Sequence, residues 1–421
     1  MKKLFYTTLL GIVLNYTLAQ SVPTIIEGAT IHTATGKVIE DGYLGFAEGK
    51  IFLCAAKMDG MYKNAIIIGA KGKHIYPGII CMGSMLGLNE IEAVRATLDF
   101  KETGDINPNV RSLIAYNTDS KILPTALSNG ILFTQSVPQG GLVSGTSSLM
   151  RTHAWNWEDA AIKTDDGVHV NWPQEYSYKG WWAEPGNSQK EKIENELNDL
   201  KQFLQQSLQY SQQAKPEVFN ARLDAMKEVM KGTKNIYIHA NDAKTIIAAI
   251  TYCTQFPLVK IILIDAADAW QVNALLVKHK IPVVFTNVHQ LPKHNHSNLH
   301  QPYKTVAELV KSGITVAIGH QGYWETRNLV FNAGTAAAYG LSKEQALQCI
   351  TANPAKIMGI DNRIGSLEKG KDASFIISTG DILDMRTSIV ETIFLDGKGV
   401  DMNNHQKQLY QKYLDKYNLK N

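Results

Sequence analysis

The sequence predicts an α/β fold, a TIM-like (β/α)8 barrel with a small composite β-sandwich domain formed by both termini. Three observations predict it: strand-and-turn patterns fill residues 20–77, strand-like and helix-like runs alternate over residues 78–360, and strand-and-turn patterns return over residues 361–402. Strands at both ends around one alternating core place the two ends in one domain. Residues 403–421 are expected to form a helical tail.

The composition points to small-molecule or protein partners. A chain of 421 residues is long enough for one large barrel and a smaller domain, and a hydrophobic fraction of 44% permits a large core. The 42 Lys and Arg nearly balance the 39 Asp and Glu, and no block of like charge marks a nucleic-acid surface. Nucleic acid is therefore excluded as the expected partner.

The first residues have the pattern of a secretory signal peptide. Lys2 and Lys3 precede an apolar run over residues 4–14, and small residues lead to a cleavage site after Ala19. A membrane anchor is the alternative, but the run is too short to span a bilayer and Asn15 interrupts its end. We therefore expect an exported protein, periplasmic or secreted in a bacterium, with no membrane span after cleavage.

The cysteines are predicted to be buried free thiols. They are widely spaced, lie in apolar periodic segments and include no Cys-x-x-Cys pair, which argues against a disulfide framework or a zinc knuckle. They are Cys54, Cys81, Cys253 and Cys349.

The barrel region alternates between two kinds of segment. Leucine and isoleucine recur at steps of three and four between residues 188 and 214, which predicts a long outer helix; the repeat is too short for a coiled coil. The clearest strands are residues 131–137, 236–239, 261–264, 283–285 and 316–318.

The segment from His74 to Leu88 is predicted to enter the barrel. The sequence Tyr76-Pro77-Gly78-Ile79-Ile80, followed by Leu86-Gly87-Leu88, resembles the first barrel strand of the amidohydrolase superfamily, in its imidazolonepropionase-like branch. Residues 48–51, 365–373 and 396–397 resemble that family's two-part terminal domain, so the resemblance covers most of the mature chain. It implies a hydrolase of carbon-nitrogen (non-peptide) bonds in a small or cyclic amide, with one divalent metal, zinc first, activating water.

The metal ligands of that family are incomplete here. The family's first strand ends in Asp-x-His-x-His, whereas this chain has Gly83 and Met85 at the histidine positions. His239, after the strand 236–238, resembles the family's fifth-strand histidine, although a histidine at a strand end can equally be a hydrogen-bonded structural residue. Asp265 stands where the family has its sixth-strand histidine and is a carboxylate ligand or, the favoured alternative, a helix cap.

The family's last-strand aspartate is also replaced. Depending on a one-residue register, His320 or Gln321 takes that position, and only histidine titrates near neutral pH. His239, Asp265 and His320 are the candidate metal ligands, a number that suits a catalytic but not a structural zinc site. His320 and Asp265 are the candidate catalytic residues, and a turn histidine with one hydrogen bond is the alternative for His320.

Residues that can grip a substrate carboxylate or carbonyl are Gln139, Arg111 and Arg327. Gln139 lies in the Gly- and Ser-rich stretch 137–148, which is interpreted as an anion-binding or lid loop. Other groups are interpreted as packing or solvated residues: the tryptophans Trp155, Trp157, Trp172, Trp181 and Trp182, and the loop histidines His289, His294, His296 and His300.

Two functional hypotheses remain open. One is an exported metal-dependent hydrolase, supported by the family resemblance. The other is a catalytically inactive member that binds a small molecule or assembles with an active barrel paralogue, supported by the missing ligands. Under either hypothesis the protein can form a homo-oligomer. Metal content and turnover of cyclic amides separate them.

Overall fold

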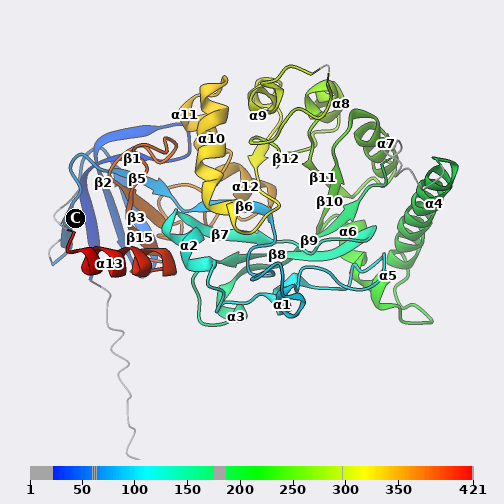
Figure 1. Ribbon diagram of the computed structural model, residues 1–421, viewed down its shortest axis with the longest axis horizontal. Coiled ribbons are helices and arrows are strands. Elements are labelled where there is room, and N and C mark those ends of the chain that lie inside the picture. Colours follow the sequence, from blue (N-terminus) through cyan, green and yellow to red (C-terminus); the bar gives the residue numbers. More distant parts are fainter. Residues whose placement is uncertain are drawn as a thin grey trace, which may run out of the picture.

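The computed structural model describes residues 22–58, 60, 62, 64–174, 186–295 and 297–419, without the side chains of residues 186–189. The predicted signal peptide, Trp181, Trp182 and His296 lie outside the described residues. The described chain contains two eight-stranded sheets, one built from both ends of the chain and one forming the barrel, which lie side by side in Figure 1. This arrangement confirms the predicted fold class.

The terminal sheet joins strands that are more than 300 residues apart. Its order is β16-β15-β14-β5-β1-β2-β3, with β4 beside β1, and β14 pairs antiparallel with β5. Alternate side chains pack on its own core, which includes Ile31, Leu44 and Phe375. The strands are β1 (Thr24–His32), β2 (Val38–Ala47), β3 (Lys50–Ala55), β4 (Ile66–Gly69), β5 (His74–Pro77), β14 (Phe375–Ser378), β15 (Val390–Leu395) and β16 (Lys398–Gly399).

The barrel sheet begins directly after β5. Its order is β13-β12-β11-β10-β9-β8-β7-β6, and a parallel bridge between Met82 and Gly319 brings the first and last strands together. The strands are β6 (Ile79–Ser84), β7 (Ile131–Ser136), β8 (Val143–Arg151), β9 (Ala161–Asn171), β10 (Asn235–Ala240), β11 (Lys260–Asp265), β12 (Val283–Phe285) and β13 (Val316–Ile318). The carboxyl ends of β9 to β13 therefore lie at one face, where barrel active sites are found.

The barrel differs from the parallel one expected, because β8 runs antiparallel to both β7 and β9. Only residues 137–142 connect β7 to β8, and a parallel crossover needs a dozen or more residues. The interpretation of residues 137–148 as one loop was wrong for residues 143–148, which are buried in β8. Their small side chains suit a strand that neighbours cover on both sides.

Helices cover the outside of the barrel. The long helix α4 packs Leu200 and Leu204 against Val168 and Val170 of β9, which confirms the outer helix predicted over residues 188–214. In Figure 1, α10 and α11 stand on the side of the barrel that faces the terminal sheet, and α13 lies along that sheet. No helix in the described part of the chain is long and apolar enough to span a membrane.

The α-helices are α1 (Ser112–Ala115), α2 (Leu123–Ser128), α3 (Trp157–Ala160), α4 (Gly186–Ser211), α5 (Ala221–Ala225), α6 (Lys227–Met230), α7 (Ala243–Cys253), α8 (Asn273–Lys278), α9 (Gln301–Lys311), α10 (Leu329–Ala338), α11 (Lys343–Gln348), α12 (Ala352–Ile357) and α13 (His405–Tyr417). Short 3-10 helices occupy Arg95–Thr97, Ala269–Gln271 and Glu325–Asn328.

Candidate functional site

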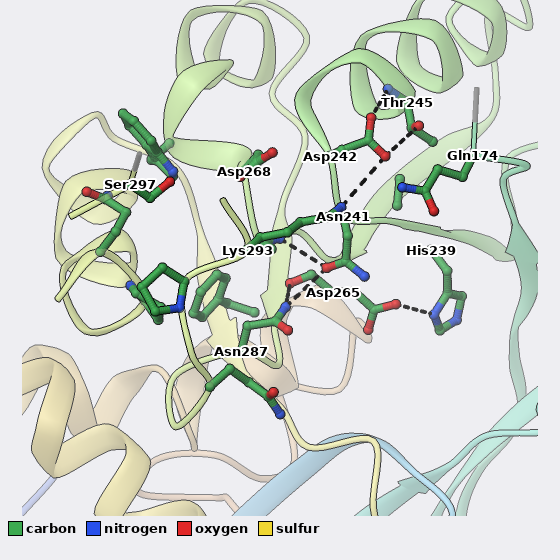
Figure 2. A pocket seen from close by; sticks show the side chains of 18 of the residues that line it. Gln174, His239, Asn241, Asp242, Thr245, Asp265, Asp268, Asn287, Lys293 and Ser297 are labelled. Carbon is green, nitrogen blue, oxygen red and sulfur yellow. Dashed lines mark hydrogen bonds and ion pairs between the residues drawn. The ribbon is translucent and has the colours of Figure 1, made fainter. Parts of the chain in front are cut away.

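A cavity of about 500 Å³ opens at the carboxyl ends of β9 to β12 (Figure 2). Its lining combines aromatic rings, side-chain amides and charged groups. The aromatic residues are Trp172, Trp270 and Phe285; the amides include Asn171, Gln174, Asn241 and Asn287; the charged residues are Asp242, Asp265, Asp268 and Lys293, with His239 among them. This position and lining are typical of a small-molecule site.

His239 and Asp265 are in direct contact on the wall of this cavity. His239 Nδ1 lies 3.0 Å from Asp265 Oδ2, and both side chains are buried. His239 comes from the inward face of β10 and Asp265 from the end of β11, neighbouring parallel strands in which His239 pairs with Ile264. The carboxylate can only accept, so His239 carries a proton on Nδ1.

The turn after β11 holds Asp265 in an unusual backbone conformation. Asp265 and Ala266 have φ values of 75° and 60°, in the left-handed region that non-glycine residues rarely occupy. Backbone N–H of Ala266 donates to Ala240 O at 2.9 Å, and Asn287 Nδ2 donates to Asp265 O at 2.6 Å. These contacts fix a strained turn at the cavity wall, which is common at functional sites.

The other oxygen of Asp265 is also occupied. Gln321 Nε2 donates to Asp265 Oδ1 at 2.6 Å, and Thr286 Oγ1 donates to the same atom at 3.1 Å. The favoured interpretation of Asp265 as a helix cap was therefore wrong: Asp242 caps α7, and the carboxylate of Asp265 joins strand ends. The one-residue register after β13 brings Gln321, not His320, to Asp265.

The second ring nitrogen of His239 contacts another histidine. His239 Nε2 lies 2.9 Å from Nδ1 of the fully buried His169, and His169 Nε2 lies 2.9 Å from Ser147 Oγ. Burial first, and then neighbouring His239, hold the pKa of His169 well below the ordinary histidine value, so His169 is neutral. His239 donates to Asp265, and the contacts of His169 with His239 and with Ser147 extend this hydrogen-bonded chain away from the cavity wall.

Polar side chains continue this chain of hydrogen bonds across the barrel interior. Gln135 Nε2 donates to Ser147 Oγ and to Asp166 Oδ2, both at 3.2 Å. The hydroxyl of Tyr237 also donates to Asp166, and Lys163 Nζ lies 2.8 Å from the other carboxylate oxygen. Burial first, and then Asp166, raise the pKa of Tyr237 well above its ordinary value, so its phenol stays protonated as a donor.

The end of the first barrel strand is bound to the last one by backbone contacts. Gly83 has a φ of 77°, and its N–H donates to Gln135 Oε1 at 3.2 Å. Met82 O accepts from His320 N at 3.0 Å, and Met85 N donates to Gln321 O at 3.3 Å. The first-strand positions of the expected metal ligands thus form a glycine turn against the loop after β13.

Comparison with known proteins identifies the family. Residues 189–400, half of the chain, match the amidohydrolase family. The chain belongs to the amidohydrolase family. A 5-methylthioadenosine/S-adenosylhomocysteine deaminase of Acetivibrio thermocellus is 22% identical over 94% of this chain and 97% of that protein. An imidazolonepropionase of Syntrophobacter fumaroxidans is 34% identical over 20% of each chain.

Solved structures show the same fold. An amidohydrolase from Thermotoga maritima superposes with a TM-score of 0.76 at 22% identity, covering 90% of this chain and 99% of that one. An adenosine deaminase from Xanthomonas campestris with bound zinc superposes with a TM-score of 0.54 at 14% identity, covering 94% and 98%. At these identities the likeness concerns the fold, and the ligand set is decided by this chain's own residues.

The residues present do not fit the metal that amidohydrolases usually hold. A ligand needs a free lone pair, but both ring nitrogens of His239 have partners and Gln321 presents an N–H to Asp265. Gly83 and Met85 offer no imidazole. Across the described ranges, no three His, Cys, Asp or Glu side chains are grouped so that they can hold a metal ion.

Of the three candidate metal ligands, the structure brings two together. His239 and Asp265 share the cavity wall, whereas Nδ1 of His320 accepts from Gly322 N at 3.0 Å. Burial is the main cause that lowers the pKa of His320, which keeps its imidazole neutral. This contact matches the turn-histidine alternative, and His320 is not among the residues that line the cavity.

The three candidate substrate-gripping residues lie outside the cavity lining. Arg111 pairs with Asp165 through two contacts of 2.8 Å, on the outer side of β8 and β9. Arg327 donates to Trp324 O at 3.1 Å and lies over the ring of the same residue. The backbone N–H of Gln139 donates to Phe100 O, and its side-chain Nε2 is buried without a hydrogen-bond partner among the described residues.

Sequence reasoning missed several residues of the site. The alternation in 167–171, with Gly, His and Asn on one face and two valines on the other, is the signal that could have placed His169 inside the barrel. Asn241 and Asn287 follow strand ends but have no distinctive motif. Of the loop histidines, His294 Nε2 lies 2.8 Å from Asp268 Oδ2, beside the cavity, and His289 contacts Thr335.

Proposed function

We propose that this amidohydrolase-family protein binds a small polar molecule in the cavity at the barrel mouth without the family's metal-activated hydrolysis. The observation that carries the proposal is that both ring nitrogens of His239 and both carboxylate oxygens of Asp265 already have protein partners. The cavity volume of about 500 Å³ lies in the range of about 300–1,000 Å³ usual for small-molecule sites.

The fixed amides of the lining support a ligand that carries both an acceptor and a donor. Asn241 Oδ1 accepts from Ala267 N at 3.2 Å and from Asn287 Nδ2 at 3.3 Å. Among the described residues, this leaves Asn241 Nδ2 as a donor and Asn287 Oδ1 as an acceptor. Amides held in one orientation beside aromatic rings suit a planar heterocycle or an amide, and purine nucleosides and imidazolones, named in the relatives, are the first ligands to test.

The experiment is a binding screen on the purified mature protein. Trp172 and Trp270 line the cavity, so a ligand is expected to change tryptophan fluorescence and to raise the melting temperature. The panel contains methylthioadenosine, cyclic amides and dipeptides, and bound Zn, Mn and Fe are measured on the same sample. Trp270→Ala should weaken binding, whereas Trp155→Ala, which changes an exposed tryptophan away from the cavity, should not.

Two results contradict this proposal: a panel with no binding, or turnover that requires a stoichiometric metal. Turnover is the second candidate function, hydrolysis of a carbon-nitrogen bond. It is favoured by the direct His239–Asp265 contact on the cavity wall and by a deaminase relative that aligns with 94% of the chain. Metal-stimulated turnover that is lost in Asp265→Asn and retained in Arg327→Ala would establish it.

We also infer that the protein is exported. The inference rests on the basic start, the apolar run of residues 4–14 and the small residues before Ala19. Expression in a bacterium should yield a mature chain beginning at Gln20 in the periplasmic fraction, as measured by mass spectrometry. A full-length chain that stays in the cytoplasm would contradict it.

A further inference from the structure

We propose that Gln321 closes the metal position of this barrel with hydrogen bonds, as a positioning residue that joins strand ends which a divalent cation would otherwise join. The inference concerns the same site as the proposed function and rests on it for the absence of metal chemistry. It adds a residue and a structural cause for that absence.

Gln321 bridges three strand ends. Its side chain reaches Asp265 at the end of β11, its own backbone follows β13, and its carbonyl accepts from Met85 N just beyond β6. Thr286 after β12 and His239 in β10 donate to the same carboxylate. Asp265 is therefore the point at which the ends of five neighbouring barrel strands are connected, directly or through Gln321.

The polarity of these contacts decides what the site can hold. A carboxylate lone pair binds either an N–H or a cation, and a side-chain amide oriented by that carboxylate must present its nitrogen. Gln321 and Thr286 occupy Oδ1, and His239 occupies Oδ2. His169 in turn occupies the remaining nitrogen of His239. Oδ2 keeps one further lone pair, but a cation held by more than that single ligand can enter only if one of these protein partners leaves.

The test exchanges donor for acceptor at one atom. Gln321→Glu keeps the length of the side chain but replaces N–H with a carboxylate oxygen beside Asp265 and His239, whereas Gln321→Met removes the polar group at similar size. All three mature proteins are dialysed against EDTA, and their melting temperatures and metal contents are measured without metal and with ZnCl2 or MnCl2. Without metal, both variants should melt at least ~2 °C below the unaltered protein.

The response to metal separates a hydrogen-bonded closure from simple packing. Zn²⁺ or Mn²⁺ should restore the melting temperature of Gln321→Glu with about one bound ion per chain. The introduced carboxylate and Asp265 then supply two ligands, and Nδ1 of His239 becomes the third when the ion displaces its proton. Added metal should leave the melting temperatures of the unaltered protein and of Gln321→Met unchanged. If Gln321→Glu does not fold, the metal titration of the unaltered protein still tests whether the native site is closed to a cation.

The proposal is overturned if the unaltered protein binds one ion per chain and gains a stability that Asp265→Asn abolishes. It is also overturned if Gln321→Met has the same melting temperature as the unaltered protein, or if Gln321→Glu folds and takes up no metal. These outcomes are distinct from failure of the proposed function, because a protein without stoichiometric metal can still bind none of the ligands in the screen.

Discussion

The imidazole of His32 lies between two partners at the junction of the terminal sheet and the barrel: its Nδ1 is 2.6 Å from Glu344 Oε1 and its Nε2 is 3.0 Å from His74 Nδ1. His32 and His74 belong to β1 and β5, and Glu344 to α11 on the barrel side. Tyr76 stacks on His32 at 4.4 Å between ring centroids. Two parts of the fold are thus connected through two histidines and one carboxylate.

This junction should make stability depend on pH. Burial first, and then neighbouring His32, lower the pKa of His74 below its ordinary value of 6.5, with Asp381, Glu40 and Lys343 as smaller influences. The unfolded chain therefore binds more protons than the folded one as the pH falls. The stabilising effect of neutral His74 is complete above the ordinary pKa and is lost as the pH falls from that value through the lower pKa of the folded state, as melting curves between pH 8 and 5 should show.

His74→Gln is the matched variant, because glutamine keeps a polar side chain that does not titrate. Its melting temperature should fall less steeply with acid than that of the unaltered protein. His279→Gln, at an exposed histidine at the other end of the barrel, serves as the control and should keep the full pH dependence. Parallel curves for the unaltered protein and His74→Gln would contradict this prediction.

Tyr237→Phe should destabilise the protein by about 1–3 kcal/mol, because it removes a donor from the buried carboxylate of Asp166. Denaturant unfolding measures the change. Tyr339→Phe removes only a long contact at the surface, 3.4 Å from His300, and should stay within about 0.5 kcal/mol of the unaltered protein. Equal effects of the two substitutions would show that the hydroxyl of Tyr237 is unimportant.

Gly83→Ala should cost about 1–2 kcal/mol from the left-handed backbone alone. A Cβ there would also meet Ile264 Cδ1 at 3.0 Å, whereas a Cβ added at Gly359, with φ of 66°, would meet no atom within 4 Å. Gly83→Ala should therefore exceed Gly359→Ala in free-energy cost, as measured by denaturant unfolding. The same strain means that Gly83→His does not simply rebuild a metal ligand. A Gly83→Ala protein with the stability of the unaltered protein would contradict the predicted strain.

The native thiols should react slowly with a disulfide reagent. Burial raises the pKa of Cys81, Cys253 and Cys349 to about 12 and that of Cys54, with a contribution from Glu368, to about 11. Little thiolate is then available near neutral pH. Ellman's reagent at pH 8 should titrate four thiols within minutes only after unfolding, and rapid reaction of the native protein would contradict the prediction.

The hydrophobic pattern of the sequence predicted most of the barrel strands and the long outer helix. Runs such as 236–239, 261–264 and 283–285 lie buried in β10, β11 and β12, and the helix predicted over 188–214 is α4. The strand β8 was missed because residues 143–148 are mainly Ser, Gly and Thr, without an apolar run, and they were interpreted as part of a loop. The antiparallel direction of β8 follows from its short connection to β7. Only the six-residue link between β7 and β8 contains that information, and its glycines suggested a loop.

The site was predictable only in part, for a geometric reason. His239 and Asp265 end neighbouring strands, so strand order alone brings them together, but the choice between His320 and Gln321 depends on a single peptide unit after β13. Arg111 pairs with Asp165, 54 residues away, a partner that no local pattern reveals. A charged side chain forms its ion pair with the residue of opposite charge that the folded chain places beside it, and this partner can be distant in the sequence.

By itself the sequence determined the barrel, the domain shared by both ends and the absence of histidines at Gly83 and Met85, because apolar periodicity and residue identity are local properties of the chain. Only the tertiary structure decided what replaced them. The contacts among Gln321, Asp265 and His239 depend on distances and donor directions between strand ends, and those exist only once the barrel has closed.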